Sequence, residues 1–482
     1  MRSAMNESLT ELTEQELGHV PLSLVDDAGT VFRWHDRVLR GVKEAAAERM
    51  QALLDSGLLT DLMERGWIPR CRKADVRIQG FSLVIEQDLL PVVTYPYEWS
   101  YGMLRDAAIR VLDINSLARA HGWELKDCHG FNIVFDGPQP LWVDLGSFVP
   151  RAKRARGWLA YEQFLRFFEY PLWIWSHGGE FTARRMVAVS EPMSHVDYGL
   201  YRWPWMRWAG AGFYQKLMTR WHHEYRHISR VSDDKIRARL PALFGGLVCF
   251  MNERGWLPFQ EVPERRMRAR TLRRRRRGPR GFWSDYQGSN AQFVATGRFR
   301  CIIELLRQAG AESVIELGGN QGWLSEQLLR DGVVKSAICT DADEPAVDRA
   351  YERTKAATGR LHTAVLDFIF PLAVPYCEPA RARLRADAVC ALAVTHHLLL
   401  TQKIPIRPVL QTIAAHSRRL VFVEFMPLGL WDGRRAPPIP DWYRLDWFRE
   451  AFVREFDLVH EESLEENRIL FCGTLRKPAP GL

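Results

Sequence analysis

The stretch VIELGGNQGW, residues 314–323, decides the fold expected of this chain. Apolar residues surround one acid, Glu316, and lead into a turn that holds three glycines. Residues 324–330, LSEQLLR, follow with apolar side chains at helical spacing. The order strand, glycine turn, helix is typical of the first unit of a nucleotide-binding α/β sheet. Gly318 and Gly322 can adopt backbone angles that other residues avoid, and they let a ligand approach the main chain.

The acid in this turn indicates what kind of ligand binds there. A dinucleotide-binding turn relies on bare glycines, so that a pyrophosphate reaches the helix N-terminus. Glu316 places a carboxylate at the strand end, which suits a cationic group such as an α-amino group. A nucleoside that carries an α-amino group is S-adenosylmethionine (SAM). The competing interpretation of the turn is a dehydrogenase, so the strands that follow have to decide between the two.

Further acids stand at the ends of the next predicted strands. Residues 337–340 form a short apolar strand that ends at Asp341, and this acid follows the glycine turn at about the twenty-residue spacing expected of a ribose-binding carboxylate. Residues 361–368 form a third strand, where Asp367 can accept a hydrogen bond from an adenine amino group. The sequence therefore predicts one cofactor pocket, formed by Glu316, Gly318, Gly322, Asp341 and Asp367.

Catalytic candidates follow the fourth and fifth strands. Residues 386–393, ADAVCALA, are a continuous apolar run that suits a buried parallel strand, and this run leads to His396 and His397. Histidine titrates near neutral pH and suits a general base for a hydroxyl acceptor. Residues 420–425, LVFVEF, deliver Glu424, which would orient a histidine or bind an acceptor group. The alternative for each histidine is a packing or backbone-bonded role.

With these motifs in order, residues 283–482 resemble the class I SAM-dependent methyltransferases, which have a Rossmann-like α/β fold. Asn320 replaces the middle glycine of the usual E-x-G-x-G-x-G turn, and a histidine pair followed by leucine after the fourth strand is common in that superfamily. The predicted final strand pair, residues 456–460 and 468–474, argues against a dehydrogenase. The resemblance implies SAM as cofactor. The residues that carry it are Glu316, Gly318, Gly322, Asp341, Asp367 and Asp387.

A second region, residues 125–148, reads LKDCHGFNIVFDGPQPLWVDLGSF. Asn132 lies five residues after Asp127, and a strand, a turn and a second strand lead to Asp144. This pattern resembles the H-R-D-x-x-x-x-N loop, hairpin and D-F-G motif of the protein-kinase-like fold. The resemblance implies an α+β kinase-like domain over residues 1–262. It also implies that Asp127 accepts a proton from the acceptor hydroxyl and that Asn132 and Asp144 hold Mg²⁺ with ATP.

Several positions depart from the kinase pattern. Leu125 and Lys126 replace the histidine and arginine of the loop, and no G-x-G-x-x-G loop is found near Gly29. The lysine that pairs with phosphates is not identified by sequence, and its candidates are Arg33, Lys43 and Lys73. The alternative interpretation is a hairpin in which the aspartate and asparagine cap turns.

Residues 265–280 hold ten arginines and no acid, whereas the whole chain has a net charge of +8. A block of like charge resists burial, and Gly278-Pro279 ends any helix. We therefore expect residues 263–282 to be a solvated linker between the two domains. No aromatic residue interleaves the arginines and no nucleic-acid-binding module surrounds them, so the sequence argues against a nucleic-acid partner and predicts at most weak attraction to polyanions.

The composition favours a cytoplasmic protein. The eight cysteines are scattered without a CxxC pair, the first residues lack an apolar signal segment, and no run has the length of a membrane span. We expect a SAM-dependent methyltransferase acting on a small molecule or glycan, with a kinase-like domain that phosphorylates or presents the substrate. The alternative is a scaffold protein with a degenerate kinase fold. The acceptor atom and the oligomeric state stay open.

Overall fold

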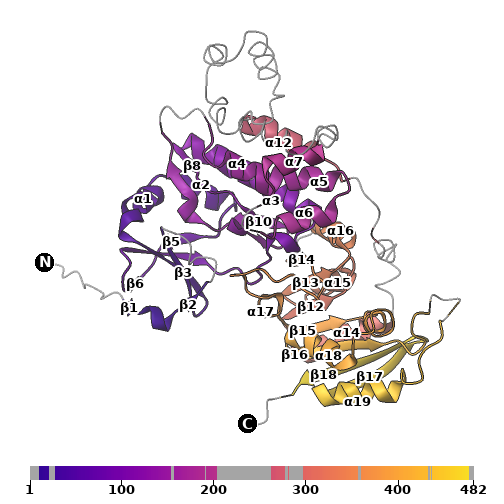
Figure 1. The fold of residues 1–482 in the computed structure, drawn as a ribbon. Helices are drawn as coiled ribbons and strands as arrows, with labels where there is room; N and C mark the ends of the chain where they lie inside the picture. Colours follow the sequence, from indigo (N-terminus) through magenta and orange to yellow (C-terminus); the bar gives the residue numbers. More distant parts are fainter. Residues whose placement is uncertain are drawn as a thin grey trace. The chain divides into compact units, whose positions relative to one another are not determined.

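The computed structural model describes residues 10–20, 28–152, 157–189, 192–202, 262–276, 281, 297–355, 360–431, 435 and 437–476. The chain divides into two compact units (Figure 1). Unit 1 consists of residues 1–89, 104–134 and 140–278, and unit 2 consists of residues 90–103, 135–139 and 279–482. The division between residues 278 and 279 falls inside the expected linker, but two segments of the N-terminal half belong to unit 2.

Unit 1 contains a five-stranded antiparallel sheet with the strand order β2-β3-β4-β7-β5. Phe32 and Leu39 face each other across β3 and β4 and are fully buried in its core. The sheet strands are β2 (Gly18–His19), β3 (Gly29–Trp34), β4 (Arg37–Val42), β5 (Cys71–Lys73) and β7 (Leu83–Asp88). The short strands are β1 (Thr10–Leu12) paired with β6 (Val76–Ile78), β8 (Trp123–Leu125) paired with β11 (Phe148–Pro150), and β9 (Ile133–Asp136) paired with β10 (Gln139–Trp142).

The helices of unit 1 follow the apolar spacing of the sequence. The long helix α3 (Tyr101–Ala120) agrees with the helix expected over residues 101–121, although its first three residues belong to unit 2. The others are α1 (Glu44–Asp55), α2 (Leu58–Glu64), α4 (Tyr161–Phe164), α5 (Tyr170–Ser176), α6 (Glu180–Met186), α7 (His195–Arg202) and α12 (Glu264–Arg273).

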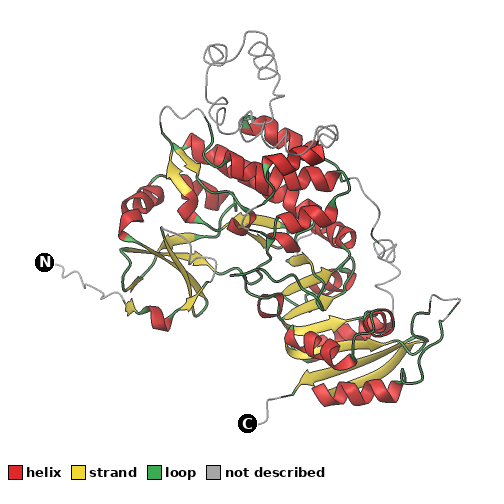
Figure 2. Cartoon of the chain, in the orientation of Figure 1, coloured by secondary structure: helices red, strands yellow, loops and turns green. Residues whose placement is uncertain are grey.

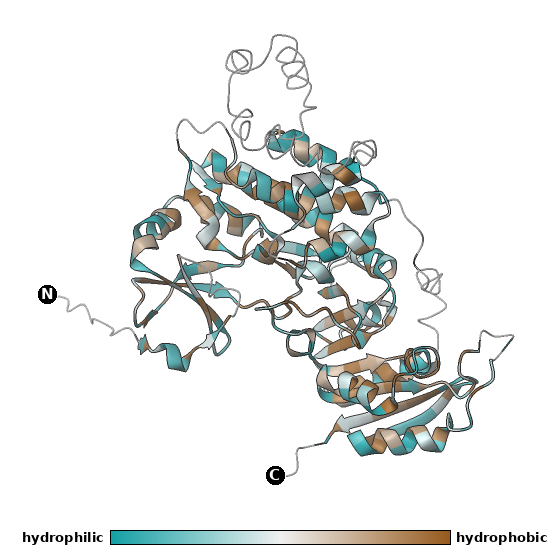
Figure 3. Cartoon of the chain, viewed as in Figure 1, coloured by the Kyte–Doolittle hydropathy of each residue, from teal (hydrophilic) through white to brown (hydrophobic). Residues whose placement is uncertain are grey.

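The arginine-rich segment is helical where the structure describes it, so the expectation of a solvated linker is wrong for residues 264–276. Helix α12 buries Met267 and Thr271 completely, while most of its surface is hydrophilic (Figure 3). Acids from distant parts of unit 1 pair with four of the described arginines, which reduces the repulsion between the like charges. The pairs are Arg268 with Asp113, Arg270 and Arg274 with Glu169, and Arg276 with Glu180. Residues 277–280 of the run lie outside the described residues.

Unit 2 is built on a seven-stranded sheet with the order β14-β13-β12-β15-β16-β18-β17 (Figure 2). The first five strands in this order are parallel, and β18 and β17 form an antiparallel pair at one edge. The strands are β12 (Ser313–Leu317), β13 (Ser336–Asp341), β14 (Leu361–Val365), β15 (Ala386–Ala391), β16 (Ser417–Phe425), β17 (Phe456–Glu465) and β18 (Arg468–Leu475). The predicted Rossmann-like sheet with a final strand pair is therefore present.

Helices cover both faces of this sheet, which explains the continuous apolar runs of its central strands. Val314 packs with α14 (Gly297–Gln308) and α15 (Trp323–Arg330) in one core. Its neighbour Ile315 points to the other face and packs with α17 (Ala380–Arg383), α18 (Ile406–Ala415) and α19 (Leu445–Glu455). Helix α16 (Glu344–Thr354) packs against β13 and β14. From β12 the chain adds β13 and β14 on one side of the sheet and then β15 and β16 on the other side. The order of the strands therefore reverses between β12 and β15, which is where ligands of such folds bind.

The two N-terminal segments complete unit 2 through buried polar contacts. The carboxylate of Glu98 pairs with the guanidinium of Arg383 at 2.6 Å, and only 3% and 1% of the two side chains are exposed. The same guanidinium lies 4.0 Å from the ring centre of Tyr95. In the second segment, the backbone N–H of Gly137 donates to Nδ1 of His362 at 3.2 Å. Residues 283–482 alone therefore lack buried partners that this unit uses.

Replacing Glu98 by alanine tests this assignment. The substitution leaves Arg383 buried without its carboxylate, so we expect the free energy of unfolding to fall by about 3–5 kcal/mol. Chemical denaturation of the full-length chain measures this change. The matched control is Glu304→Ala, which removes an exposed pair with Arg307 and should change stability by less than about 1 kcal/mol. Equal effects of the two substitutions would contradict the assignment.

Candidate functional site

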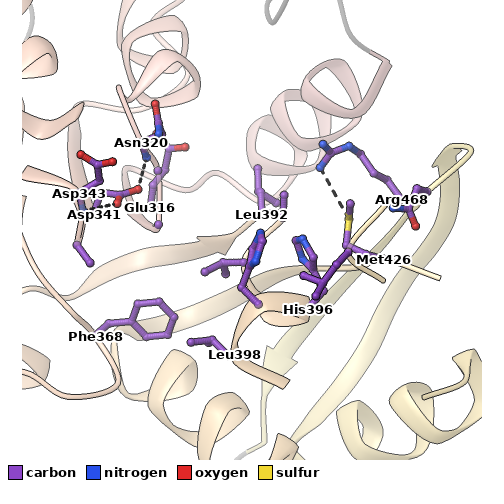
Figure 4. A pocket seen from close by; sticks show the side chains of 18 of the residues that line it. Glu316, Asn320, Asp341, Asp343, Phe368, Leu392, His396, Leu398, Met426 and Arg468 are labelled. Carbon is purple, nitrogen blue, oxygen red and sulfur yellow. Dashed lines mark hydrogen bonds between the residues drawn. The ribbon is translucent and has the colours of Figure 1, made fainter. Parts of the chain in front are cut away.

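A cavity of about 900 Å³ opens in unit 2 at the carboxyl ends of the parallel strands (Figure 4). This volume lies in the range of small-molecule and cofactor sites. Six of the predicted residues line the cavity, namely Glu316, Gly318, Asp341, Asp367, His396 and His397. Gly322 and Glu424 were also predicted to be in the site, but they stand behind this lining rather than in it.

The glycine turn has the left-handed backbone that the sequence required. Gly318 and Gly322 have φ angles of 73° and 71°, and a Cβ on Gly318 would come within 3.1 Å of a methyl group of Val394. Asn320, which replaces the middle glycine, has a φ of 53°. Asparagine is one of the few other residues that tolerate this region, so the departure from the usual motif leaves the turn intact.

Asp341 holds the turn against the next loop. Its Oδ2 accepts the backbone N–H of Asn320 at 2.7 Å, and its Oδ1 accepts that of Asp343 at 2.8 Å (Figure 4). Burial raises the pKa of Asp341 to about 6. Each carboxylate oxygen has a second lone pair, so both can still accept a hydroxyl from a ligand.

Asp367 follows β14 at the neighbouring part of the cavity. Its carboxylate is exposed and accepts the backbone N–H groups of Ile369 and Phe370 at 3.0 and 2.9 Å. The buried side chains of Leu366 and Phe368 flank it and also line the cavity. This part of the site therefore offers two apolar surfaces beside one acid, which suits a flat ring with an amino group.

Glu316 lines the cavity and also accepts hydrogen bonds from the start of the following helix. Its Oε1 accepts both the backbone N–H and the hydroxyl of Ser325, at 2.9 and 2.5 Å, and so fixes the start of α15. Burial raises the pKa of Glu316 from its ordinary value of 4.5 to about 7, although the bonds from Ser325 work in the opposite direction. Burial therefore destabilises the ionised form of Glu316, and a cationic ligand would stabilise that form.

The histidine pair lies at the end of β15, with ring centres 4.0 Å apart. Burial lowers the pKa of His396 to about 3 and also lowers that of His397, so both rings are neutral near pH 7. Within the described part of the chain, Nδ1 of His396 has no hydrogen-bond partner. A general base works best with a pKa near the working pH, so this geometry favours His396 as a hydrogen-bonding contact to an acceptor.

The role expected of Glu424 is wrong. Its carboxylate is fully buried and contacts neither histidine nor the cavity; it pairs with Nη1 of Arg298 at 3.3 Å and with Nη1 of Arg468 at 3.0 Å. Both arginines line the cavity, so Glu424 acts by positioning them. Sequence reasoning missed these arginines. The sequence predicted the strand that begins at Arg468 but not its neighbour: β18 runs antiparallel to β16, so its start lies beside the end of β16.

Asp387, matched to the methyltransferase pattern by sequence, lies at the edge of the sheet opposite to the cavity. It stands at the start of β15, where its Oδ2 accepts the backbone N–H groups of Glu312 and Ser313 at 2.9 and 3.1 Å. Parallel strands start at the same edge, so this acid stabilises the edge opposite to the cavity.

In unit 1 the structure brings two of the three kinase-like candidates together. Oδ1 of Asp144 pairs with Arg40 at 2.9 Å, and its Oδ2 accepts the hydroxyl of Ser147, which also accepts from Nδ2 of Asn132 at 3.3 Å. Burial works to raise the pKa of Asp144, but Arg40 and these hydrogen bonds outweigh it and lower the pKa. Asp127 is partly exposed and has Lys126 at 3.7 Å.

This arrangement does not fit the Mg²⁺ site that the sequence predicted for Asn132 and Asp144. Both oxygens of Asp144 are already engaged by groups of the chain, and Arg40 balances its charge. The cation beside Asp144 comes from β4, at a position outside the three candidates considered from sequence.

No protein-family model matches the chain. The chain is 28% identical over 444 residues to the nodulation protein NoeA of Rhizobium meliloti (strain 1021), and the match covers 85% of each protein. Three solved methyltransferase structures are similar to it at low identity. Magnesium protoporphyrin IX methyltransferase of Synechocystis PCC 6803 with bound SAM is 15% identical, with a TM-score of 0.29, and the match covers 39% of this chain and 80% of the other.

The other two structures are of similar likeness. The N-methyltransferase NodS of Bradyrhizobium japonicum WM9 is 16% identical, with a TM-score of 0.28, and the match covers 37% of this chain and 95% of NodS. A SAM-dependent methyltransferase of Clostridium acetobutylicum ATCC 824 is 10% identical, with a TM-score of 0.31, over 39% of this chain and 96% of that one. Separately, none of the helices in the described residues has the length and apolar character needed to cross a membrane.

The raised pKa of Glu316 predicts how stability depends on pH. A carboxyl whose pKa is higher in the folded state binds its proton more tightly there, so its stabilising effect is complete below about pH 4.5 and disappears as pH rises through 7. Glu316→Gln keeps an acceptor for Ser325 and has no charge. We expect the ligand-free variant to be more stable than the wild type at pH 8, by up to about 3 kcal/mol.

Denaturation at pH 5 and pH 8 measures this difference on the full-length chain. Glu312→Gln, at an exposed acid paired with Lys335, is the control and should leave the pH dependence unchanged. A Glu316→Gln variant that loses as much stability between the two pH values as the wild type would show that the carboxyl is not the cause.

Proposed function

We propose that unit 2 is a class I SAM-dependent methyltransferase domain. The observation that carries the proposal is the position of Asp341 and Glu316: two buried acids at the ends of adjacent strands, joined by one glycine turn, beside a cavity of cofactor size. The strand order and the antiparallel pair of β17 and β18 support the same class.

The residues present suit SAM. Asp341 would accept the ribose hydroxyls, and Leu366 and Phe368 would hold the adenine, with Asp367 accepting from its amino group. Glu316 would meet the α-amino group, whose charge offsets the cost of that buried acid. When bound, SAM supplies a methyl group on a sulfonium, and transfer from it is an in-line displacement that needs alignment rather than strong acid or base chemistry.

The remaining cavity residues would serve the acceptor. His396 is neutral and can bind an acceptor group, while Arg298 and Arg468, held by the buried Glu424, add polar groups to the cavity lining. Trp431 also lines the cavity. We propose a small-molecule or glycan acceptor. The name of the relative NoeA, a nodulation protein whose match covers 85% of this chain, supports a role connected with nodulation.

For unit 1 we propose a degenerate kinase-like domain that presents the substrate. The supporting observation is that the hairpin brings Asn132 and Asp144 together, as the kinase-like pattern predicts, and both contact Ser147. The negative charge of Asp144 is paired with Arg40. The scaffold alternative based on polyanion attraction loses support, because Arg268, Arg270, Arg274 and Arg276, half of the eight described arginines of this run, pair with acids of unit 1.

SAM binding by the full-length chain, measured by titration calorimetry, tests the first proposal. Asp341→Ala removes a charge-assisted acceptor for ribose, and we expect a loss of about 2 kcal/mol, or about thirtyfold in affinity. Asp387→Ala is the matched control, because it removes an acid from the opposite edge of the same sheet and should keep wild-type affinity. Equal affinities of all three proteins would place the ligand elsewhere.

The second proposal predicts that ATP does not stabilise the protein in a magnesium-dependent way. Thermal melting of the full-length chain at millimolar ATP, with and without Mg²⁺, measures this through mass action. Asp144→Asn should lower the melting temperature without nucleotide, because it removes the charge partner of buried Arg40. A magnesium-dependent ATP shift in the wild type that Asp144→Asn abolishes would restore the predicted metal–nucleotide site.

A further inference from the structure

Three potential metal ligands meet in unit 2 outside the cavity. Cys301 comes from α14, and His460 and Glu462 come from β17. Sγ of Cys301 lies 3.7 Å from Nε2 of His460 and 3.6 Å from Oε2 of Glu462, and those two atoms lie 2.9 Å from each other. In the described part of the chain no other group of three such side chains comes this close.

These distances match the edges of a zinc coordination tetrahedron. With Zn–S near 2.3 Å and Zn–N and Zn–O near 2.1 Å, tetrahedral angles place sulfur about 3.6 Å from each light ligand and the nitrogen about 3.4 Å from the oxygen. The distances from Sγ of Cys301 to Nε2 of His460 and to Oε2 of Glu462 therefore already match those of a zinc site. The distance between Nε2 and Oε2 has to increase by about half an ångström, because metal bonds would replace the hydrogen bond between His460 and Glu462.

The backbone explains why the three side chains converge. His460 and Glu462 are two residues apart on one strand, so they point to the same face of the sheet. The register with β18 shifts between Leu458 and His460, and such bulges re-aim side chains at sheet edges. Strand β17 is the last strand of the sheet, and Glu462 is exposed, so water can reach a fourth coordination position.

We propose that Cys301, His460 and Glu462 form a zinc site with water as the fourth ligand. A thiolate, an imidazole and a carboxylate together suit zinc better than the hard cations Mg²⁺ and Ca²⁺, which prefer oxygen ligands. The bound ion links α14 to β17. Helix α14 carries Arg298, and Arg468 begins β18, which pairs with β17, so the ion would hold α14 to the strand pair on this side of the cavity.

In the metal-free protein the same three groups satisfy one another. The thiol of Cys301 donates to Glu462, so the three side chains are held together by contacts with one another.

Zinc binding to the full-length chain tests the proposal. After dialysis against Zn²⁺, elemental analysis should find one equivalent more in the wild type than in Cys301→Ser. Cys71→Ser is the matched control, because Cys71 is equally half-buried but lies in unit 1. Using the difference between variants removes any contribution from ligands elsewhere in the chain.

The absorption spectrum of the Co²⁺-substituted protein is a second measurement, and a change in stability alone would not alter it. The Co²⁺ form of the wild type and of Cys71→Ser should show a thiolate-to-cobalt charge-transfer band, and Cys301→Ser should lack it. Glu462→Gln alters only an exposed side chain, so folding is preserved; it should keep the band but weaken cobalt binding by about tenfold or more. Absence of the band in the wild type, or equal zinc in wild type and Cys301→Ser, would overturn the proposal.

Discussion

Two buried carboxylates at the ends of β12 and β13 fix the part of unit 2 on which the rest of the site depends. Asp341 holds the backbone of Asn320 inside the glycine turn, and Glu316 holds the start of α15 behind it. Burial raises the pKa of both acids, so the ionised, ligand-free site carries an unfavourable desolvation cost. The proposed ligand, which has a cationic group and hydroxyls, would reduce this cost and would link the stability of the turn to binding.

The side of the cavity proposed to bind the acceptor contains a different buried polar group, an ion-paired carboxylate. Glu424 lies between Arg298 and Arg468 in a region with little solvent, where the pairing fixes both guanidinium groups before any ligand arrives. The adjacent histidines stay neutral because burial penalises their charged form. Such a site can orient two reactants at low reorganisation cost, which is the main requirement of an in-line displacement.

Local patterns predicted the parts of the structure that local forces determine. The strand, turn and helix around Gly318, the acid at the end of β13, and the final strand pair follow from periodicity and backbone preferences, which the sequence displays directly. Asn320 departs from the usual glycine of the motif, but asparagine tolerates left-handed backbone angles, so the turn keeps its conformation.

The predictions that went wrong concern charges whose partners lie far away in sequence. Arg270 of α12 pairs with Glu169, which lies far away in the sequence, and no window of sequence reveals this acid. The ion pair of Glu98 with Arg383 joins residues 285 positions apart, so local patterns could not show that residues 90–103 belong to unit 2.

The central claim, that the cavity of unit 2 binds SAM through Asp341 and Glu316, is tested most directly by a crystal structure of the full-length chain with S-adenosylhomocysteine. The account predicts ligand density at the carboxyl ends of β12 to β15, with the ribose hydroxyls on Asp341, the adenine between Leu366 and Phe368, and the amino group facing Glu316. Density at any other place in the chain, or an empty cavity at saturating ligand, would contradict it.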